Sequence, residues 1–331
     1  MKICSRCFNL DSRPRITFKN DICNACYNAD EKRRIEWNTR NDEFIKVREQ
    51  MLKYAIDHDN KYHCIIPWSG GKDSSSIAIK LKKEFSLNPL LVTFSPLIPN
   101  QIGEFNRKLL IDEGFDAIFL SPNGNVSKLL AKRFFFERGN PKVAWDAGVN
   151  AGPIKIALNM NIPFIFYAEH GESEYGGLTL SEESKKIRDF TEVIEHQIGD
   201  YPENWVSKNI SLNDLDPYIY PEKILSKNLD IKVYYFSYFF KWSMFENYNY
   251  IKEHLPKFKT DEYGRSQGTF TNFDSLDDKI DDLYYYMQYI KFGFGRCVRD
   301  VNRFIQNGHL QRDIGLDHIN KFDGEFPSRN H

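Results

Sequence analysis

Short apolar runs alternate with amphipathic stretches between residues 62 and 167. The apolar runs have the length of buried strands, and the stretches between them have the length and periodicity of helices. Strands that alternate with helices in this way usually pair in parallel, because each helix carries the chain back to the start of the next strand. The pattern therefore predicts an α/β fold with an open parallel sheet and helices on both faces. The predicted strands are 64–68, 90–94, 117–120 and 164–167, and the predicted helices are 74–85, 103–113, 126–136 and 154–160.

The pattern changes on both sides of this segment. Before it, apolar residues such as Phe44, Val47 and Met51 recur at three- and four-residue steps among charges, which predicts a connecting helix. After about Ser181 the chain shows no strand alternation, so we expect a mainly helical region that packs on the sheet. The predicted domains are an N-terminal knob (residues 1–28), the connecting helix (29–60), the α/β domain (61–180) and the helical C-terminal region (181–331).

The N-terminal knob contains four of the six cysteines, in two pairs that each enclose two residues. Thiols at this spacing can reach one ion, and the segment between the pairs can fold back to complete a tetrahedral site. The pattern predicts a structural Zn²⁺ site, because four thiolates leave no open position for a substrate. Two disulfides or a redox pair are the alternatives, and a cytosolic setting disfavours disulfides. The predicted zinc ligands are Cys4, Cys7, Cys23 and Cys26.

Composition narrows the class of protein. The 331 residues include 45 lysines and arginines against 46 aspartates and glutamates, whereas a protein that coats nucleic acid or anionic membrane would show a basic excess. No apolar stretch approaches the length of about 20 residues that a membrane span needs, and the first residues show no secretory signal. We therefore expect a soluble cytoplasmic protein with no membrane span and no nucleic-acid partner.

The most informative segment, Ser69 to Ser75, directly follows the first predicted strand and opens a helix. Its two glycines allow a tight turn and a close approach of the backbone to a ligand, and the helix N-terminus favours an anion. The hydroxyl groups of the loop and the charge of its lysine would add to the binding of phosphate groups. The spacing differs from that of a Walker loop. The predicted phosphate-binding residues are Ser69, Gly70, Gly71, Lys72, Asp73, Ser74 and Ser75.

This segment resembles the SGGxDS pyrophosphate loop of the ATP-pyrophosphatase (PP-loop) superfamily, whose fold is adenine nucleotide alpha hydrolase-like. The resemblance implies that ATP is cleaved between its α- and β-phosphates, that a substrate oxygen is adenylated, and that pyrophosphate and Mg²⁺ are held at the loop. Lys72 would then neutralise the departing pyrophosphate, and Asp73 would position Mg²⁺. The alternative for Asp73 is that it only caps the helix.

Longer stretches make the chain similar to the N-acetyl sugar amidotransferase family (WbpG/PseA-like). The resemblance implies an enzyme that converts an N-acetyl group of a bacterial surface sugar or nucleotide-sugar to acetamidino. The acetamido oxygen would be adenylated, ammonia would attack the carbon, and AMP would leave. Besides the cysteine-rich N-terminus, the stretches that carry the resemblance are 68–74, 162–169, 174–177, 268–273 and 289–296.

These stretches supply four further candidates. Glu169 follows a predicted strand and would orient Mg²⁺ or substrate or polarise the attacking ammonia; the alternative is a loop salt bridge. The sequence Tyr175-Gly176-Gly177 would allow the backbone to approach the substrate closely, or forms an ordinary turn. Lys291 and Arg296 would anchor ATP phosphates or an anionic sugar, or extend from a helix into solvent.

An amidotransferase also needs a source of ammonia. Outside the N-terminal knob only Cys64 and Cys297 remain, and neither lies in a setting typical of a glutaminase nucleophile. Removal of Met1 would expose Lys2, which argues against an N-terminal catalytic cysteine. The resemblance therefore suggests a separate glutaminase partner, similar to the protein pair that supplies ammonia in imidazole glycerol phosphate synthase.

Two other functions stay open at this stage. A tRNA-modifying relative can also combine zinc-binding cysteines with this loop, but thiolation usually needs a cysteine in the catalytic domain, and residues 136–166 contain none. The near-neutral net charge also fails to supply a surface that would track phosphates. A non-enzymatic zinc adaptor is the other alternative, and the intact loop disfavours it.

Overall fold

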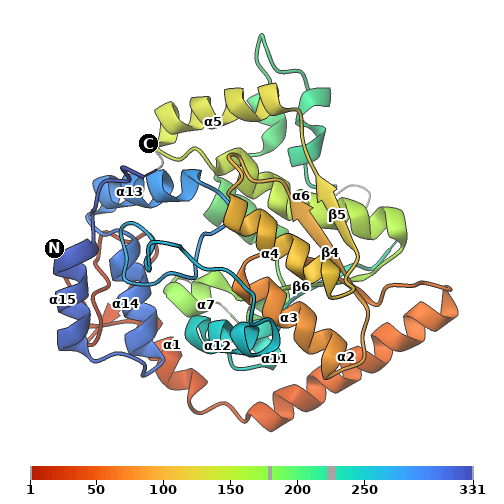
Figure 1. The fold of residues 1–331 in the computed structure, drawn as a ribbon, viewed down its shortest axis with the longest axis horizontal. Coiled ribbons are helices and arrows are strands. Elements are labelled where there is room, and N and C mark those ends of the chain that lie inside the picture. The colour runs from red at the N-terminus through yellow and green to blue at the C-terminus, as the bar shows by residue number, and fades with distance from the viewer. Residues whose placement is uncertain (1, 178–180, 222–228, 330–331) are drawn as a thin grey trace.

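Five parallel strands form the central sheet of the computed structural model, which describes residues 2–177, 181–221 and 229–329 (Figure 1). Their order across the sheet is β5-β4-β3-β6-β7. A separate antiparallel pair, β1 (Phe18–Lys19) and β2 (Ile22–Cys23), lies in the N-terminal knob. The strands of the central sheet are β3 (Cys64–Pro67), β4 (Pro89–Phe94), β5 (Ala117–Leu120), β6 (Phe164–Tyr167) and β7 (Lys232–Tyr235).

The helices occupy most of the remaining chain, and each strand of the sheet is separated from the next by at least one of them. The helices up to β6 are α1 (Asn24–Lys32), α2 (Trp37–Asp57), α3 (Lys72–Lys83), α4 (Gln101–Asp112), α5 (Gly124–Arg138) and α6 (Val143–Met160). Those after β6 are α7 (Gly171–Tyr175), α8 (Glu182–Lys186), α9 (Phe190–Val193), η1 (Ile194–Ile198), η2 (Pro202–Trp205), η3 (Asn213–Tyr218), α11 (Phe236–Phe239), α12 (Met244–His254), α13 (Ile280–Phe292), α14 (Arg296–Gln306) and α15 (Arg312–Phe322).

Helices cover both faces of the sheet, as predicted. Successive side chains of a strand point to opposite faces, so each strand contributes to two separate cores. On one face Ile66, Leu91 and Phe166 pack in a cluster with residues of α2 and α3. On the other face Ile65 and Ile165 pack in a cluster with residues of α6.

The order of the strands places one edge of the sheet where ligands usually bind. The chain leaves β3 toward one side through β4 and β5, then returns to β6 on the other side of β3. The carboxyl ends of β3 and β6 therefore flank the point where the strand order reverses, which is where open α/β sheets bind ligands. The predicted loop follows β3 directly, and Glu169 lies two residues after β6.

The region after Ser181 is mainly helical, as predicted, but it also contributes the edge strand β7. The sequence does not reveal this strand, because Tyr234 and Tyr235 continue into a run of aromatic residues whose period is ambiguous between strand and helix. The segment expected as one connecting helix forms two, α1 and α2. The predicted domain boundary at 180 falls in residues 178–180, outside the described residues, and the domain division stays a prediction.

The N-terminal knob packs against the C-terminal helices rather than standing apart. Figure 1 shows the N-terminal segment beside α14 and α15. Phe8 and Leu10 share a buried cluster with Phe294, Val298 and other residues of that region. In the ranges that the structure describes, no helix is both long enough and apolar enough to cross a membrane.

Candidate active site

The loop after β3 has the geometry that its sequence predicts. Gly70 has a φ of +93°, and an added Cβ at this position would lie 2.6 Å from Cγ of Arg107. The guanidinium of Arg107 donates a hydrogen bond of 2.9 Å to the carbonyl of Ser69, which fixes the loop against α4. Gly71 is the N-cap of α3, so the free N–H groups of the first helical turn lie beside the loop. The turn therefore requires glycine and offers donors to an anion.

A cavity of about 370 Å³ lies at this edge of the sheet. Its size suits a small-molecule ligand. Apolar side chains form part of its lining, among them Val92, Phe94, Val149 and Pro153. The predicted site residues that line it are Ser69, Asp73, Ser74, Glu169 and Tyr175. The structure thus brings the loop together with two residues that lie about a hundred positions later in the sequence.

Lys72 and Ser75 belong to the loop but are not among the described residues that line the cavity. The Ser75 hydroxyl is buried and accepts a hydrogen bond of 2.9 Å from the indole of Trp68. The Lys72 ammonium, with 1% of the residue exposed, pairs with Asp73 at 2.7 Å and with Asp274. Burial alone would lower the pKa of Lys72, but the two carboxylates outweigh it and hold the pKa above its usual value.

Asp73 is held in place by two donors. One carboxylate oxygen accepts from Lys72, and the other accepts a 2.8 Å hydrogen bond from the amide of Asn247 in α12. The side chain keeps a quarter of its surface exposed. Asp73 therefore presents an oriented carboxylate to the cavity beside the loop, as a ligand for a divalent cation would.

Glu169 faces the same cavity and is half-buried. Burial raises the pKa of its carboxyl group, and the nearby Asp73 carboxylate raises it further. The Tyr175 hydroxyl donates a hydrogen bond to Glu169, and the guanidinium of Arg303 lies 3.4 Å from the centroid of the Tyr175 ring. Glu169 is thus a carboxylate with raised proton affinity, positioned by a tyrosine.

Gly176 and Gly177 form the junction between α7 and the N-terminal knob. Gly176 has a φ of +90°, and an added Cβ would lie 2.6 Å from Cδ1 of Ile16. The amide of Asn24 donates a 2.8 Å hydrogen bond to the carbonyl of Gly177, and an added Cβ there would overlap the carboxylate of Glu172. These glycines therefore allow the backbone of this segment to approach the N-terminal knob closely.

Lys291 and Arg296 lie away from the cavity. Lys291, at the end of α13, is exposed and donates a 2.8 Å hydrogen bond to the carbonyl of Arg138. Arg296, at the start of α14, is 1% exposed, pairs with Asp282 at 3.3 Å and donates to the carbonyl of Asp274. Arg296 is linked to the loop only through Asp274, and neither residue is among those that line the cavity in the described chain.

The cavity also contains two charged residues that the sequence reading did not single out. Arg188 stacks on Tyr167, with 3.9 Å between its guanidinium carbon and the ring centroid, and it bonds to amide oxygens. Within the described residues, no carboxylate pairs with Arg188. Asp146, in the first turn of α6, lines the cavity, and burial raises the pKa of its carboxyl group to about 7. Neither residue lies in a motif, so no signal in one sequence marks them.

Replacement of Asp146 by Asn should change how stability depends on pH. With a pKa of about 7 in the folded state, Asp146 holds a proton that the unfolded chain releases near its usual 3.8. The stability that this protonated side chain gives the folded state is therefore fully present below about pH 4, and it is lost as the pH rises through about 7. We expect Asp146→Asn to raise the free energy of unfolding by of order 1 kcal/mol or more at about pH 8, and by less at about pH 5. Urea unfolding at both pH values measures this, with the exposed Asp112→Asn as control, and an equal difference at both would contradict it.

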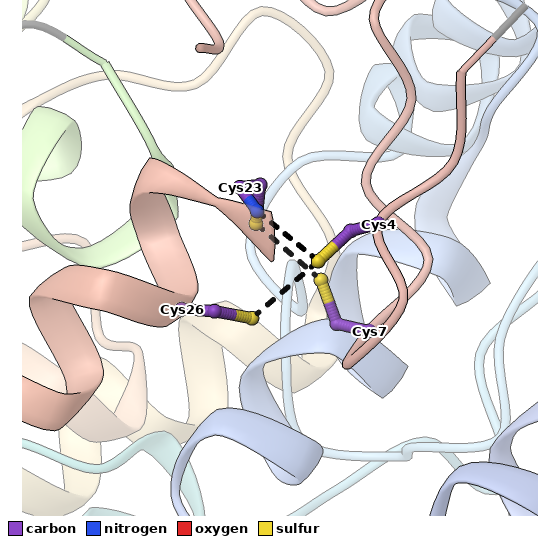
Figure 2. A group of neighbouring side chains, drawn as sticks. All are labelled: Cys4, Cys7, Cys23 and Cys26. Atoms are coloured by element: carbon purple, nitrogen blue, oxygen red, sulfur yellow. Dashed lines mark hydrogen bonds between the residues drawn. The ribbon is translucent and has the colours of Figure 1, made fainter. Parts of the chain in front are cut away.

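The four cysteines of the N-terminal knob meet at one point (Figure 2). Their sulfurs lie within 4.8 Å of one another, with 3.6 Å between Cys7 and Cys23 and 3.9 Å between Cys4 and Cys26. A tetrahedral zinc site with Zn–S bonds of about 2.3 Å requires about 3.8 Å between sulfurs. Backbone N–H groups donate to two of the sulfurs, and the Asn9 amide donates to that of Cys23, which suits thiolate ligands. The donor set fits a closed four-thiolate zinc site.

Comparison with known proteins supports the predicted resemblance. Residues 267–331 match the family model described as LPS biosynthesis protein WbpG-like, C-terminal domain. This match confirms the similarity to WbpG-like proteins over the region that includes α13 and α14. No curated protein matches the chain.

One solved structure with similarity to the chain is titled "The crystal structure of predicted subunit of tRNA methyltransferase from Methanocaldococcus jannaschii DSM". The identity is 20% and the TM-score 0.25, and the similarity covers 37% of this chain and 61% of that one. A similarity this partial supports no argument about activity. The family match and the loop geometry are both consistent with the predicted resemblance.

Proposed function

We propose that the protein is an ATP-dependent amidotransferase that converts an N-acetyl group of a bacterial surface sugar to acetamidino, with release of AMP and pyrophosphate. One observation carries the proposal: the glycine-serine loop, Asp73 and Glu169 converge on one cavity at the edge where the strand order reverses. The WbpG-like match in residues 267–331 supports a sugar as the substrate.

The cavity offers a separate environment for each part of ATP. The apolar lining, including Phe94 and Pro153, suits the adenine ring. The loop and the N-terminus of α3 suit the β- and γ-phosphates, which leave together as pyrophosphate. Arg188 has no carboxylate partner among the described residues, and its guanidinium would bind the α-phosphate. Lys72 would act through Asp73, because its ammonium already binds that carboxylate.

Asp73 would hold Mg²⁺, which would neutralise phosphate charge when bound. In the first step the acetamido oxygen attacks the α-phosphorus, and the bond to the bridging oxygen of pyrophosphate breaks. In the second step the ammonia nitrogen attacks the activated carbon, and AMP leaves with the former amide oxygen. Loss of a proton from nitrogen completes the amidine. The raised pKa of Glu169 suits it to accept that proton.

Ammonia would come from a separate glutaminase, similar to the pair in imidazole glycerol phosphate synthase. The two cysteines outside the N-terminal knob, Cys64 and Cys297, are both buried. Burial raises the pKa of each thiol, which disfavours the thiolate that a glutaminase nucleophile needs.

The test is ATP consumption with ammonium salts and a panel of N-acetylated sugars and nucleotide-sugars, compared with bulk tRNA. We expect AMP and pyrophosphate only when a sugar and ammonium are both present. If the acetamido oxygen carries ¹⁸O, the label should appear in AMP. Formation of ADP, or of AMP with tRNA alone, would contradict the proposal, and the second result would favour a tRNA-modifying enzyme.

A further inference from the structure

A second cavity, of about 400 Å³, adjoins the proposed nucleotide site. The two cavities share Asp146 and Gln197 in their linings, so they meet at these side chains. The far side of the second cavity is lined by the segment Arg13 to Arg15 of the N-terminal knob and by α13. The knob therefore takes part in a cavity that adjoins the proposed nucleotide site.

Arg13 and Lys291 both line this cavity, and no carboxylate pairs with either of them among the described residues; Arg13 is the less exposed of the two. Its Nε donates a long hydrogen bond of 3.4 Å to the carbonyl of Gly176. Burial and the positive charge of Arg303 together lower the pKa of Arg13 to about 10, although the Glu172 carboxylate acts in the opposite direction. By contrast, Arg15 forms a two-pronged ion pair with Glu172, which satisfies its guanidinium.

Arg303 strengthens the positive character of the same region. The residue is only 8% exposed, and its Nε has no hydrogen-bond partner within the described chain. A partly buried guanidinium without an ion pair is costly, so Arg13 in the wall of this cavity points to an anion that binds there. Arginine is well suited to that task, because its planar donors bind a carboxylate or phosphate through two parallel hydrogen bonds.

Besides the charged residues Lys291, Glu172 and Asp146, the lining includes side chains that suit a sugar. The cavity contains side-chain amides and a hydroxyl that can donate to and accept from sugar hydroxyls, together with aromatic rings that can cover an apolar sugar face. These residues are Asn140, Gln197, Gln288, Tyr284, Phe292 and Phe294.

We propose that this second cavity binds the acceptor sugar through an anionic group, carboxylate or phosphate, that Arg13 of the N-terminal knob holds. The acetamido group then points past Asp146 and Gln197 toward the α-phosphate of ATP. This inference rests on the proposed function for the identity of the acceptor. It assigns the knob a part in substrate binding beyond the structural one that its cysteines suggest.

The experiment measures binding by calorimetry, without turnover, in the full-length zinc-loaded protein. The probes are N-acetylneuraminic acid, which carries a carboxylate; N-acetylglucosamine 1-phosphate and UDP-N-acetylglucosamine, which carry phosphate; and neutral N-acetylglucosamine. We expect at least one anionic probe to bind at millimolar concentration or below and more tightly than the neutral sugar. The pattern among the three anionic probes identifies the charged group.

Variants distinguish a specific role of Arg13 in binding from a general loss of structure. We expect Arg13→Gln to weaken binding of the anionic probe by about 10- to 100-fold and Arg13→Lys to weaken it less. ATP affinity and zinc content should stay unchanged in both. The matched control is Arg34→Gln, an exposed arginine next to α1 that lines neither cavity, and it should bind as the parent does.

Three results would overturn the inference: no binding of any anionic probe, equal binding of the neutral sugar, or unchanged affinity in Arg13→Gln. Its failure can be told apart from failure of the proposed function. If a sugar supports AMP release but Arg13→Gln leaves KM unchanged, the inference fails and the function stands. If an anionic sugar binds through Arg13 but yields no AMP, the sugar site stands and the reaction fails.

Discussion

Replacement of Asp73 by Asn should slow ATP-dependent AMP formation by about 10²- to 10⁴-fold. The carboxylate faces the cavity beside the loop, where a cation and the departing pyrophosphate would meet. An amide has almost the same size but carries no negative charge, so it would hold Mg²⁺ poorly. The effect should therefore fall on the chemical step, and pyrophosphate release in single-turnover experiments measures it.

The variant should remain folded, which keeps the result interpretable. The buried ammonium of Lys72 would retain Asp274 as its partner, and the amide oxygen could accept from one of the two donors that hold Asp73, Lys72 or Asn247. We expect the thermal midpoint to change by only a few degrees. Asp112→Asn, at an exposed ion pair with Lys108 on α4, is the matched control and should react as the parent does. A folded Asp73→Asn variant with nearly normal AMP formation would show that the chemistry takes place elsewhere.

The sequence predicts those parts of the site whose geometry depends on residues close together in the chain. Gly70 and Gly71 stand next to each other directly after a strand, so the geometry of the turn depends on neighbouring residues alone. The sequence also predicts Glu169 as a site residue, because it follows an apolar strand and the carboxyl ends of parallel strands share one edge of the sheet. In the structure β6 ends two residues before it.

The remaining contacts depend on which distant segments meet, and one sequence does not reveal that. Lys72 has the charge to bind phosphate, yet its partner Asp274 lies 202 residues away and directs the ammonium to a carboxylate. Arg296 is buried against the same segment, although its position near two glycines resembles that of a ligand-binding residue. Helix patterns show which residues are amphipathic but not which buried charge faces a cavity.

The edge strand β7 shows that part of the fold also depends on distant contacts that one sequence does not reveal. Its four residues are too few to establish a period of two, and the helix α11 begins at the next residue. Pairing with β6 decides its conformation, since tertiary contacts override weak local preference in short aromatic runs. The strands β3 to β6 were predicted because each is a distinct apolar run bounded by polar residues.

Replacement of Cys7 by Ser should remove the metal and unfold the N-terminal knob. The protein as isolated should contain about one zinc per chain, and the variant should contain far less, because a closed site needs all four thiolates. The knob has few apolar contacts of its own, so metal binding supplies much of its folding free energy. We expect loss of several kcal/mol of stability and a thermal midpoint lower by about 5–10 °C. Metal analysis and thermal unfolding measure both effects.

The loss should reach the active site through the contacts that the knob makes. Asn24 would no longer hold the carbonyl of Gly177, and Gln306 of α14 would lose the two sulfurs to which its amide donates. The same helix carries Arg303, which lies on the Tyr175 ring next to Glu169. We therefore expect AMP formation to fall along with zinc content and to return when zinc is restored to a chelated parent protein.

Cys297→Ser is the matched control, because it makes the same chemical change at a buried cysteine of α14 that lies outside the four-sulfur cluster. It should keep its zinc and most of its activity. A fall in activity in both variants would trace the effect to packing around α14 rather than to the metal. Full stability and activity in a zinc-free Cys7→Ser variant would show that the knob folds without zinc, and would contradict the prediction.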